Sequence, residues 1–310
     1  MNKLAFVFPG QGAQVIGMGR ELAEAYPAAR AVFDEVDEAL GESLSDLIWT
    51  GDIETLTLTQ NAQPALMATS IAAFRALEAE GFGIGDADFV AGHSLGEYSA
   101  LCAAGALSLA DTTRLLRLRG AAMQEAVPVG QGAMAAILGL DFAAVDQIAR
   151  DAAEGEVCQA ANDNDPAQVV ISGHKAAVER AAVLAKERGA KRAVMLPVSA
   201  PFHSALMQPA AAAMAEALAG VEIVAPAVPL IANVRAEPVI EPGAIRRLLV
   251  EQVTGAVRWR ESIEFLAGAG VTEFWEIGAG KALSGMIKRI SKDAVVKNVG
   301  APADIAALKG

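Results

Sequence analysis

The stretch Gly92-His93-Ser94-Leu95-Gly96 decides how this chain is organised. It joins a short apolar run, Phe89 to Ala91, to a segment of helical character that we expect to begin near Glu97. The pattern G-x-S-x-G between a strand and a helix is typical of a nucleophile elbow, because two glycines permit a turn so tight that the serine projects from its tip. The alternative interpretation is a structural turn in which Ser94 only caps the following helix.

Composition limits the classes of protein to which the chain can belong. Its 310 residues are 53% hydrophobic but only 5% aromatic, which fits a large, alanine-rich α/β protein. The formal net charge of −12 argues against nucleic-acid binding, since that binding depends on neutralising phosphates. Acidic residues and prolines interrupt the longest apolar stretches well before about 20 residues, so no membrane span is predicted.

The N-terminus and the cysteines indicate a cytoplasmic protein. The apolar run after Lys3 is too short for the core of a secretory leader. The two cysteines, Cys102 and Cys158, lack the spacing of a metal site or a redox pair and are expected to be small core residues in a reducing compartment. We expect neither a resident cofactor nor a bound metal.

The order of the expected elements predicts the fold. Residues 4–8 form a buried strand that ends at Pro9-Gly10-Gln11-Gly12, a turn without the spacing of a nucleotide-binding loop. From Gly132 to Ser199 the pattern changes to β-α-β-β-α-β, which is the ferredoxin-like order. We therefore expect an α/β fold. A large α/β-hydrolase-like domain with a central, mainly parallel sheet comprises residues 1–129 and 199–310, and a small ferredoxin-like domain of residues 130–198 is inserted in it.

A polar run inside the insert, Asn162-Asp163-Asn164-Asp165-Pro166, is predicted to be a turn, because Asn, Asp and Pro favour turns. The alternative for Asn162 is a place in the cleft between the domains.

One arginine is predicted to be buried. The helix that begins after the capping sequence at Ser108 and runs to about Ala126 places Arg119 on its apolar face, and Thr113 and Arg117 on the opposite face. Because a guanidinium cannot lose its charge, a buried arginine requires an anionic partner. That partner is either one of the chain's own carboxylates or an anionic ligand.

The chain has three histidines, so few residues can serve as a general base for Ser94. His93 adjoins Ser94 in the elbow, where neighbouring side chains diverge. His174 stands at a helix start and is interpreted as a cap or surface residue. His203, in a loop after a strand, is the remaining candidate.

A stretch near the C-terminus carries a local excess of positive charge. If residues 281–297 are helical, Lys281, Lys288 and Lys292 share one face. This face is either solvated or a docking surface for an acidic partner.

Four motifs in this order and spacing carry a resemblance that spans essentially the whole chain. They are Pro9-Gly10-Gln11-Gly12, Gly92-His93-Ser94-Leu95-Gly96-Glu97, Arg117-Leu118-Arg119-Gly120 and Pro201-Phe202-His203. Together they resemble malonyl-CoA:acyl carrier protein transacylases of fatty acid synthesis, a family related to the acyltransferase domains of polyketide synthases.

The resemblance implies a role for each matching residue. Ser94 would be the nucleophile and His203 its base. Gln11 and Leu95 would form the oxyanion hole, mainly through backbone N–H groups, and Arg119 would hold the malonyl carboxylate. The remaining site candidates are Gln252, which would orient the histidine or the substrate, Gln63 and Asn162 in the cleft, and Phe202, which would select malonyl over bulkier groups.

The implied reaction is a ping-pong transfer. The malonyl group would pass from malonyl-CoA to Ser94 and then to the phosphopantetheine thiol of acyl carrier protein, and we expect a monomer. The basic residues expected to dock the carrier are Lys281, Lys288, Arg289 and Lys292. One alternative is a serine esterase or thioesterase with Asp163 or Asp165 as its acid. The other is a non-catalytic relative that only binds a carrier protein.

Overall fold

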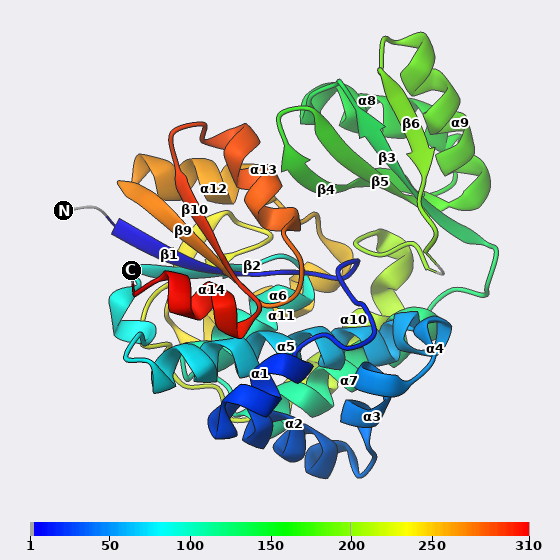
Figure 1. Ribbon diagram of the computed structural model, residues 1–310. Coiled ribbons are helices and arrows are strands. Elements are labelled where there is room, and N and C mark those ends of the chain that lie inside the picture. The colour runs from blue at the N-terminus through cyan, green and yellow to red at the C-terminus, as the bar shows by residue number, and fades with distance from the viewer. Residues whose placement is uncertain (1–2, 199, 310) are drawn as a thin grey trace.

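Two β-sheets stand side by side in the computed structural model, which describes residues 3–198 and 200–309 (Figure 1). The larger sheet has the strand order β10 (Val295–Val299), β9 (Val271–Ile277), β1 (Lys3–Phe8), β2 (Phe89–Gly92), β7 (Leu230–Ala232) and β8 (Glu237–Val239). The smaller has the order β4 (Cys158–Asp165), β5 (Gln168–His174), β3 (Gly132–Leu138) and β6 (Arg192–Met195).

The large sheet is parallel apart from the antiparallel pair of β7 and β8 at its edge. Strand β1 lies between β9 and β2, and its side chains alternate between two apolar layers. Phe6 and Phe8 belong to one core, whereas Ala5 and Val7 belong to another on the opposite face. Because both faces are covered, β1 is a continuous apolar run, as is typical of parallel sheets.

Helices cover both faces of the large sheet (Figure 1). The core that holds Phe6 also contains residues of α2, α5, α7 and α10, and the core that holds Val7 contains residues of α12 and α13. The helices outside the small sheet are α1 (Arg20–Ala25), α2 (Pro27–Leu40), α3 (Leu44–Thr50), α4 (Ile53–Thr57), α5 (Thr59–Ala79), α6 (Leu95–Ala103), α7 (Leu109–Glu125), α10 (Gln208–Ala219), α11 (Pro242–Thr254), α12 (Trp259–Gly268), α13 (Ala282–Ile290) and α14 (Pro302–Ala307), with short 3₁₀ turns at Ile84–Asp86 and Ala205–Met207. Within residues 3–198 and 200–309, no helix combines the length with the apolar character that crossing a bilayer requires.

Helix α5 begins at Thr59, ahead of Pro64. Proline usually marks a first turn, but Pro64 lies inside this helix. The preceding turn is stabilised by Asn61, whose side-chain amide donates to the carbonyl of Thr55 at 2.8 Å. As a consequence Gln63 is a helical residue, and it is buried.

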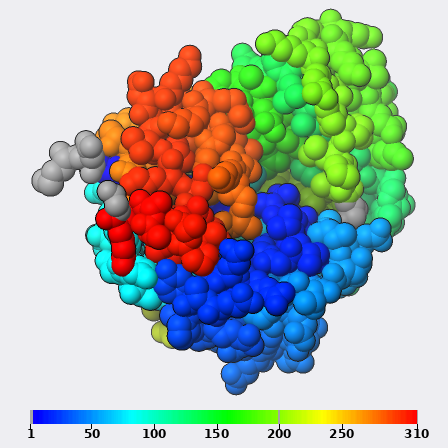
Figure 2. Space-filling model, viewed as in Figure 1, coloured from blue at the N-terminus to red at the C-terminus, as the bar shows by residue number. Residues whose placement is uncertain are grey.

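The small sheet is antiparallel throughout, and α8 (Phe142–Ala153) and α9 (Lys175–Glu187) pack on it through a separate core. Its order of strands and helices, β3-α8-β4-β5-α9-β6, is the expected ferredoxin-like one. These elements form a lobe beside the rest of the molecule, coloured green in Figure 2. The expected domain boundary at residue 199, like Met1 and Asn2, lies outside the described residues.

The turn prediction for the polar run is wrong for residues 162–165, which belong to β4, and only Pro166 lies in the turn that leads to β5. Strand β4 continues through Asp165, and residues 162–165 are all buried. Asp163 forms an ion pair with Arg260 of α12, and Asp165 forms one with Arg289 of α13. Distant arginines therefore satisfy side chains that, taken alone, favour a turn.

Candidate active site

The elbow forms as its two glycines require. Strand β2 ends at Gly92, and α6 begins at Leu95 rather than near Glu97. A Cβ at Gly92 would lie 1.9 Å from the carbonyl oxygen of Gly96, so no larger residue fits there. Between them Ser94 adopts φ 55° and ψ −111°, a strained conformation for a non-glycine residue. The surrounding packing holds this strain and projects the serine side chain.

Ser94 faces the histidine that the sequence selected. Its Oγ lies 2.8 Å from Nε2 of His203, and Nδ1 of that ring lies 2.9 Å from the backbone oxygen of Gln252. Because a carbonyl oxygen only accepts, Nδ1 carries the proton and Nε2 presents its lone pair to the serine hydroxyl. Burial and the nearby charge of Arg119 lower the pKa of His203 to about 3, which keeps the imidazole neutral and able to accept a proton.

Arg119 completes this cluster from α7. Its side chain is 1% exposed, and Nη1 donates to Oε1 of Gln63 at 2.7 Å. Nη2 donates to Oε1 of Gln252 at 2.8 Å and to Oγ of Ser94 at 3.1 Å. No carboxylate among the described residues lies within ion-pair distance of this guanidinium, so a structural salt bridge, one of the two interpretations of its burial, is excluded for them.

Two further residues organise the elbow, and no sequence pattern had indicated a role for either. Asn233, just after β7, accepts from the backbone N–H of Ser94 at 2.8 Å and donates to the carbonyl of Gly92 at 2.6 Å. Glu97 is buried and accepts from Nε2 of Gln252 at 2.6 Å. The only available signals were the position of Asn233 at the carboxyl end of a strand and that of Glu97 beside the elbow.

The two expected oxyanion donors come from adjacent segments. The turn that contains Gln11 follows β1, and the backbone N–H of His93 in the elbow donates to the carbonyl of Phe8 at 3.0 Å. The side chain of Gln11 lies 3.4 Å from Oγ1 of Thr59. Leu95 is the first residue of α6, where a backbone N–H has no partner within the helix and remains available to an anion.

Comparison with known proteins agrees with this geometry. The acyl transferase domain family matches residues 5–301. The chain belongs to this family. The malonyl CoA-acyl carrier protein transacylase of Bacillus subtilis is 54% identical over 293 residues, which are 94% of this chain and 92% of that protein.

Solved structures show the same fold. The acyl-carrier-protein S-malonyltransferase of Bartonella henselae is 58% identical and superposes with a TM-score of 0.97, covering 99% of this chain and 98% of that one. A malonyl-transacylase in complex with its type II PKS acyl-carrier protein is 43% identical, with a TM-score of 0.96 and coverage of 99% and 98%. The expected α/β fold and the resemblance to this family are confirmed.

Other predicted site residues lie at the boundary between the two sheets. Phe202, immediately before the histidine, packs against the core of the large domain and against a small cluster under the second sheet. Asn162 is buried in β4 and pairs with Val257, and within the described part of the chain it has no hydrogen bond to Ser94, His203 or Arg119. The structure therefore places Phe202 beside His203 and between two apolar clusters, and it gives Asn162 no hydrogen bond to these reacting groups.

The two carboxylates proposed for a hydrolase triad are engaged elsewhere. Asp163 pairs with Arg260 at 2.8 Å and Asp165 with Arg289 at 2.7 Å. The ring nitrogen that a triad acid would contact is bonded to the backbone of Gln252 instead. This geometry removes the acid on which the esterase alternative depended.

The basic stretch is not one helical face, so that expectation is wrong. Helix α13 spans Ala282–Ile290, and Lys281 and Lys292 lie beyond its two ends. Arg289 forms the pair with Asp165, and Nζ of Lys288 donates to the carbonyl of Ala294. Two of the four expected docking residues therefore already have partners within the chain.

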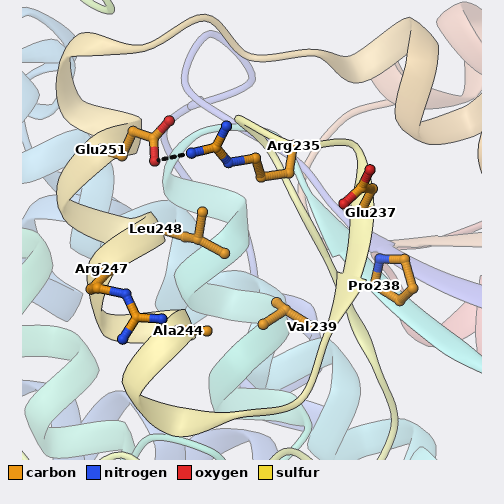
Figure 3. Close-up of a pocket in the computed structure, with 8 residues that line it drawn as sticks. All are labelled: Arg235, Glu237, Pro238, Val239, Ala244, Arg247, Leu248 and Glu251. Carbon is orange, nitrogen blue, oxygen red and sulfur yellow. Dashed lines mark hydrogen bonds and ion pairs between the residues drawn. The ribbon is translucent and has the colours of Figure 1, made fainter.

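A groove on the far side of α11 is separate from this site (Figure 3). It lies between α11 and the edge strand β8, and the Arg235–Glu251 ion pair of 2.9 Å crosses it. Glu251 is exposed there, whereas the next residue, Gln252, is fully buried toward Ser94. Successive residues of one helix thus face two different surroundings.

Proposed function

We propose that this chain transfers the malonyl group of malonyl-CoA to the phosphopantetheine thiol of an acyl carrier protein and so supplies the extender unit for fatty acid synthesis. The names and high identity of its relatives support this assignment. The observation that carries it is Arg119, a buried guanidinium without a carboxylate partner among the described residues, in contact with the Ser94–His203 pair. A planar carboxylate is the group that such a guanidinium binds best.

The first half of the reaction uses Ser94 as the nucleophile. As its oxygen bonds to the thioester carbonyl carbon, its proton moves to Nε2 of His203. The backbone N–H groups of Leu95 and Gln11 stabilise the oxyanion, aided by the positive end of α6. The tetrahedral intermediate collapses by breaking the C–S bond, and the imidazolium returns its proton to the coenzyme A sulfur. Malonyl-Ser94 and free coenzyme A result.

The second half is the reverse with a new thiol. His203 takes the proton of the phosphopantetheine thiol, and the phosphopantetheine sulfur attacks the ester carbonyl of malonyl-Ser94. The bond to the serine oxygen then breaks, and His203 returns the proton to that oxygen. Serine and imidazole carry out this exchange without a resident cofactor. Throughout, Arg119 would hold the malonyl carboxylate, with Gln63 and Gln252 supporting the guanidinium from either side.

Two further statements belong to this proposal. The carrier protein would dock near the entrance through residues of the basic stretch, with Lys281 and Lys292 as its available charges. The compartment would be the cytoplasm, since the two cysteines are both unpaired and buried, as is common in reducing surroundings.

Intact-protein mass spectrometry tests the function directly. Incubation with malonyl-CoA should add one malonyl group at Ser94, and holo acyl carrier protein should then remove it and become malonylated. Steady release of coenzyme A without a carrier would instead favour a thioesterase, and absence of any adduct would favour a binding module. A panel of acyl-CoA donors defines the selectivity, with acetyl-CoA expected to be slower by roughly several orders of magnitude.

A further inference from the structure

Glu97 is a buried carboxyl that the proposed reaction does not use. It is 1% exposed and lies on α6, one turn after Ser94. Its Oε2 accepts two hydrogen bonds, one from Nε2 of Gln252 at 2.6 Å and a longer one from the backbone N–H of Asn233 at 3.4 Å. A buried acid without a salt bridge is costly, so a specific use for its acceptor oxygen is expected.

The hydrogen bonds of Gln252 indicate that use. Its Nε2 donates to Glu97, to the backbone oxygen of Ser94 at 2.9 Å and, over a longer 3.4 Å, to Oδ1 of Asn233. Both N–H bonds of the amide therefore point at oxygen acceptors, and Oε1 is left to accept from Nη2 of Arg119 at 2.8 Å. A flipped amide would place Oε1 against these oxygens and its NH₂ group against the guanidinium, which has only donors.

We propose that Glu97 is a positioning residue that fixes the orientation of the Gln252 amide and, through it, the guanidinium of Arg119 that receives the malonyl carboxylate. The inference rests on the proposed function, because it assigns Glu97 to the selectivity of that same site. Glu97 does not touch the substrate carboxylate itself. Its effect passes through one amide group.

The guanidinium needs this support because few groups hold it. Gln63 accepts from Nη1 at 2.7 Å, and Gln252 and Ser94 accept from Nη2. The Nε atom has no partner among the described residues. Without an oriented Gln252, the Nη2 end of the fork would depend on the serine hydroxyl, which the reaction itself consumes.

The acceptor oxygen, rather than negative charge, accounts for the role. Burial raises the pKa of Glu97 to about 8, although the hydrogen bond from Gln252 and the charge of Arg119 oppose the rise. The carboxyl is therefore largely neutral at pH 7, and a neutral carboxyl still accepts through its carbonyl oxygen. The titratable groups around it are Arg119 and Tyr98, whose ring lies 5.7 Å from that guanidinium carbon.

Two substitutions distinguish the contribution of the acceptor oxygen of Glu97 from that of its negative charge. Glu97→Met keeps much of the side-chain volume but removes the acceptor, whereas Glu97→Gln keeps an acceptor oxygen and removes the charge. For each variant we would measure kcat/KM for malonyl-CoA and, on the same preparation, the rate at which an uncharged fluorophosphonate labels Ser94. The ratio of the two is independent of the folded fraction, because unfolded protein lowers both.

The expected result is a split between the variants. Glu97→Met should lower the ratio about ten- to hundredfold, the value of the hydrogen bond from the charged Arg119 guanidinium to Gln252, with the loss appearing in KM for malonyl-CoA. Glu97→Gln should restore the ratio to within about threefold of wild type. An unchanged ratio in Glu97→Met would overturn the inference, and so would an equal fall in both variants, because charge would then be the cause.

Glu276→Met is the matched control. Glu276 is also a fully buried carboxyl, but it accepts from Leu283 and Ser284 at the start of α13. Its loss should lower stability and leave the ratio unchanged; a fall equal to that in Glu97→Met would overturn the inference as well. The proposed function is judged separately, since it fails only if the wild-type chain shows no malonyl transfer.

Discussion

Replacing Arg119 by methionine tests whether this arginine binds the substrate carboxylate or serves to stabilise the fold. The methionine side chain fills much of the same volume without a charge. In the folded chain it would remove the donors to Gln63, Gln252 and Ser94. We expect malonyl transfer to fall steeply while the protein stays folded.

The magnitude of both effects follows from the contacts. Two charge-assisted hydrogen bonds to a malonyl carboxylate contribute roughly 1.5–3 kcal/mol each, so kcat/KM for malonyl-CoA should fall by about two to four orders of magnitude. For stability, the variant loses hydrogen bonds to two buried amide oxygens but no longer buries a charge that lacks an ion-pair partner. We expect these terms to offset to within about 1 kcal/mol, whereas removing one partner of a buried ion pair costs about 3–5 kcal/mol.

The assay pairs single-turnover acylation of Ser94 by malonyl-CoA and by acetyl-CoA with urea unfolding of both proteins. The malonyl rate should fall and the acetyl rate should change little or rise. Equal losses toward both donors would refute the clamp, because the arginine would then act on the serine rather than on the substrate. A destabilisation of about 3 kcal/mol or more would show that Arg119 is structural.

Three further predictions concern charge. Arg119 lowers the pKa of His203, so Arg119→Met should raise it and move the acid limb of p-nitrophenyl acetate hydrolysis to higher pH; an unmoved limb would contradict the coupling. His203 stays neutral in the folded chain down to about pH 3 but takes up a proton near pH 6.5 when the chain is unfolded. The free energy of unfolding should therefore fall by up to about 1.4 kcal/mol per pH unit below 6.5. In His203→Gln, urea unfolding at a series of pH values should show a weaker dependence of that free energy on pH. Lys281→Glu with Lys292→Glu should raise KM for carrier protein but spare acylation by malonyl-CoA, and unchanged carrier kinetics would leave these lysines on a solvated face.

Local sequence predicted the parts of the site that depend on local geometry. The elbow could be inferred because only glycine fits at Gly92 and Gly96, where a Cβ would lie 1.9 Å and 2.2 Å from backbone oxygens. The burial of Arg119 followed from its place on the apolar face of a helix, although the same pattern wrongly placed Thr113 on the exposed side. Periodicity resolves a helix face only coarsely, and Thr113 is accommodated because its hydroxyl donates to the carbonyl of Leu109 at 2.8 Å.

Long-range contacts decided what local sequence could not. Asn233 and Glu97 acquire their roles from groups far away in the chain, such as the bond from Gln252 to Glu97, so no local pattern marks them. Asp163 and Asp165 were assigned to a turn because turn propensity was the only visible signal. Tertiary ion pairs overrode that propensity.

Three arginines contrast in how their charge is balanced. Arg260 and Arg289 are 24% and 52% exposed, and each pairs with a buried aspartate of β4. Arg119, at 1% exposure, is far more deeply buried, yet within the described residues it donates hydrogen bonds only to amide and hydroxyl oxygens. Stability alone would favour the opposite arrangement of carboxylate partners, because Arg119, the most deeply buried of the three charges, is the one that lacks a carboxylate. This arrangement is explained if the substrate provides the carboxylate partner of Arg119. Binding of the malonyl group then pairs the buried guanidinium with an anion and places the thioester beside Ser94.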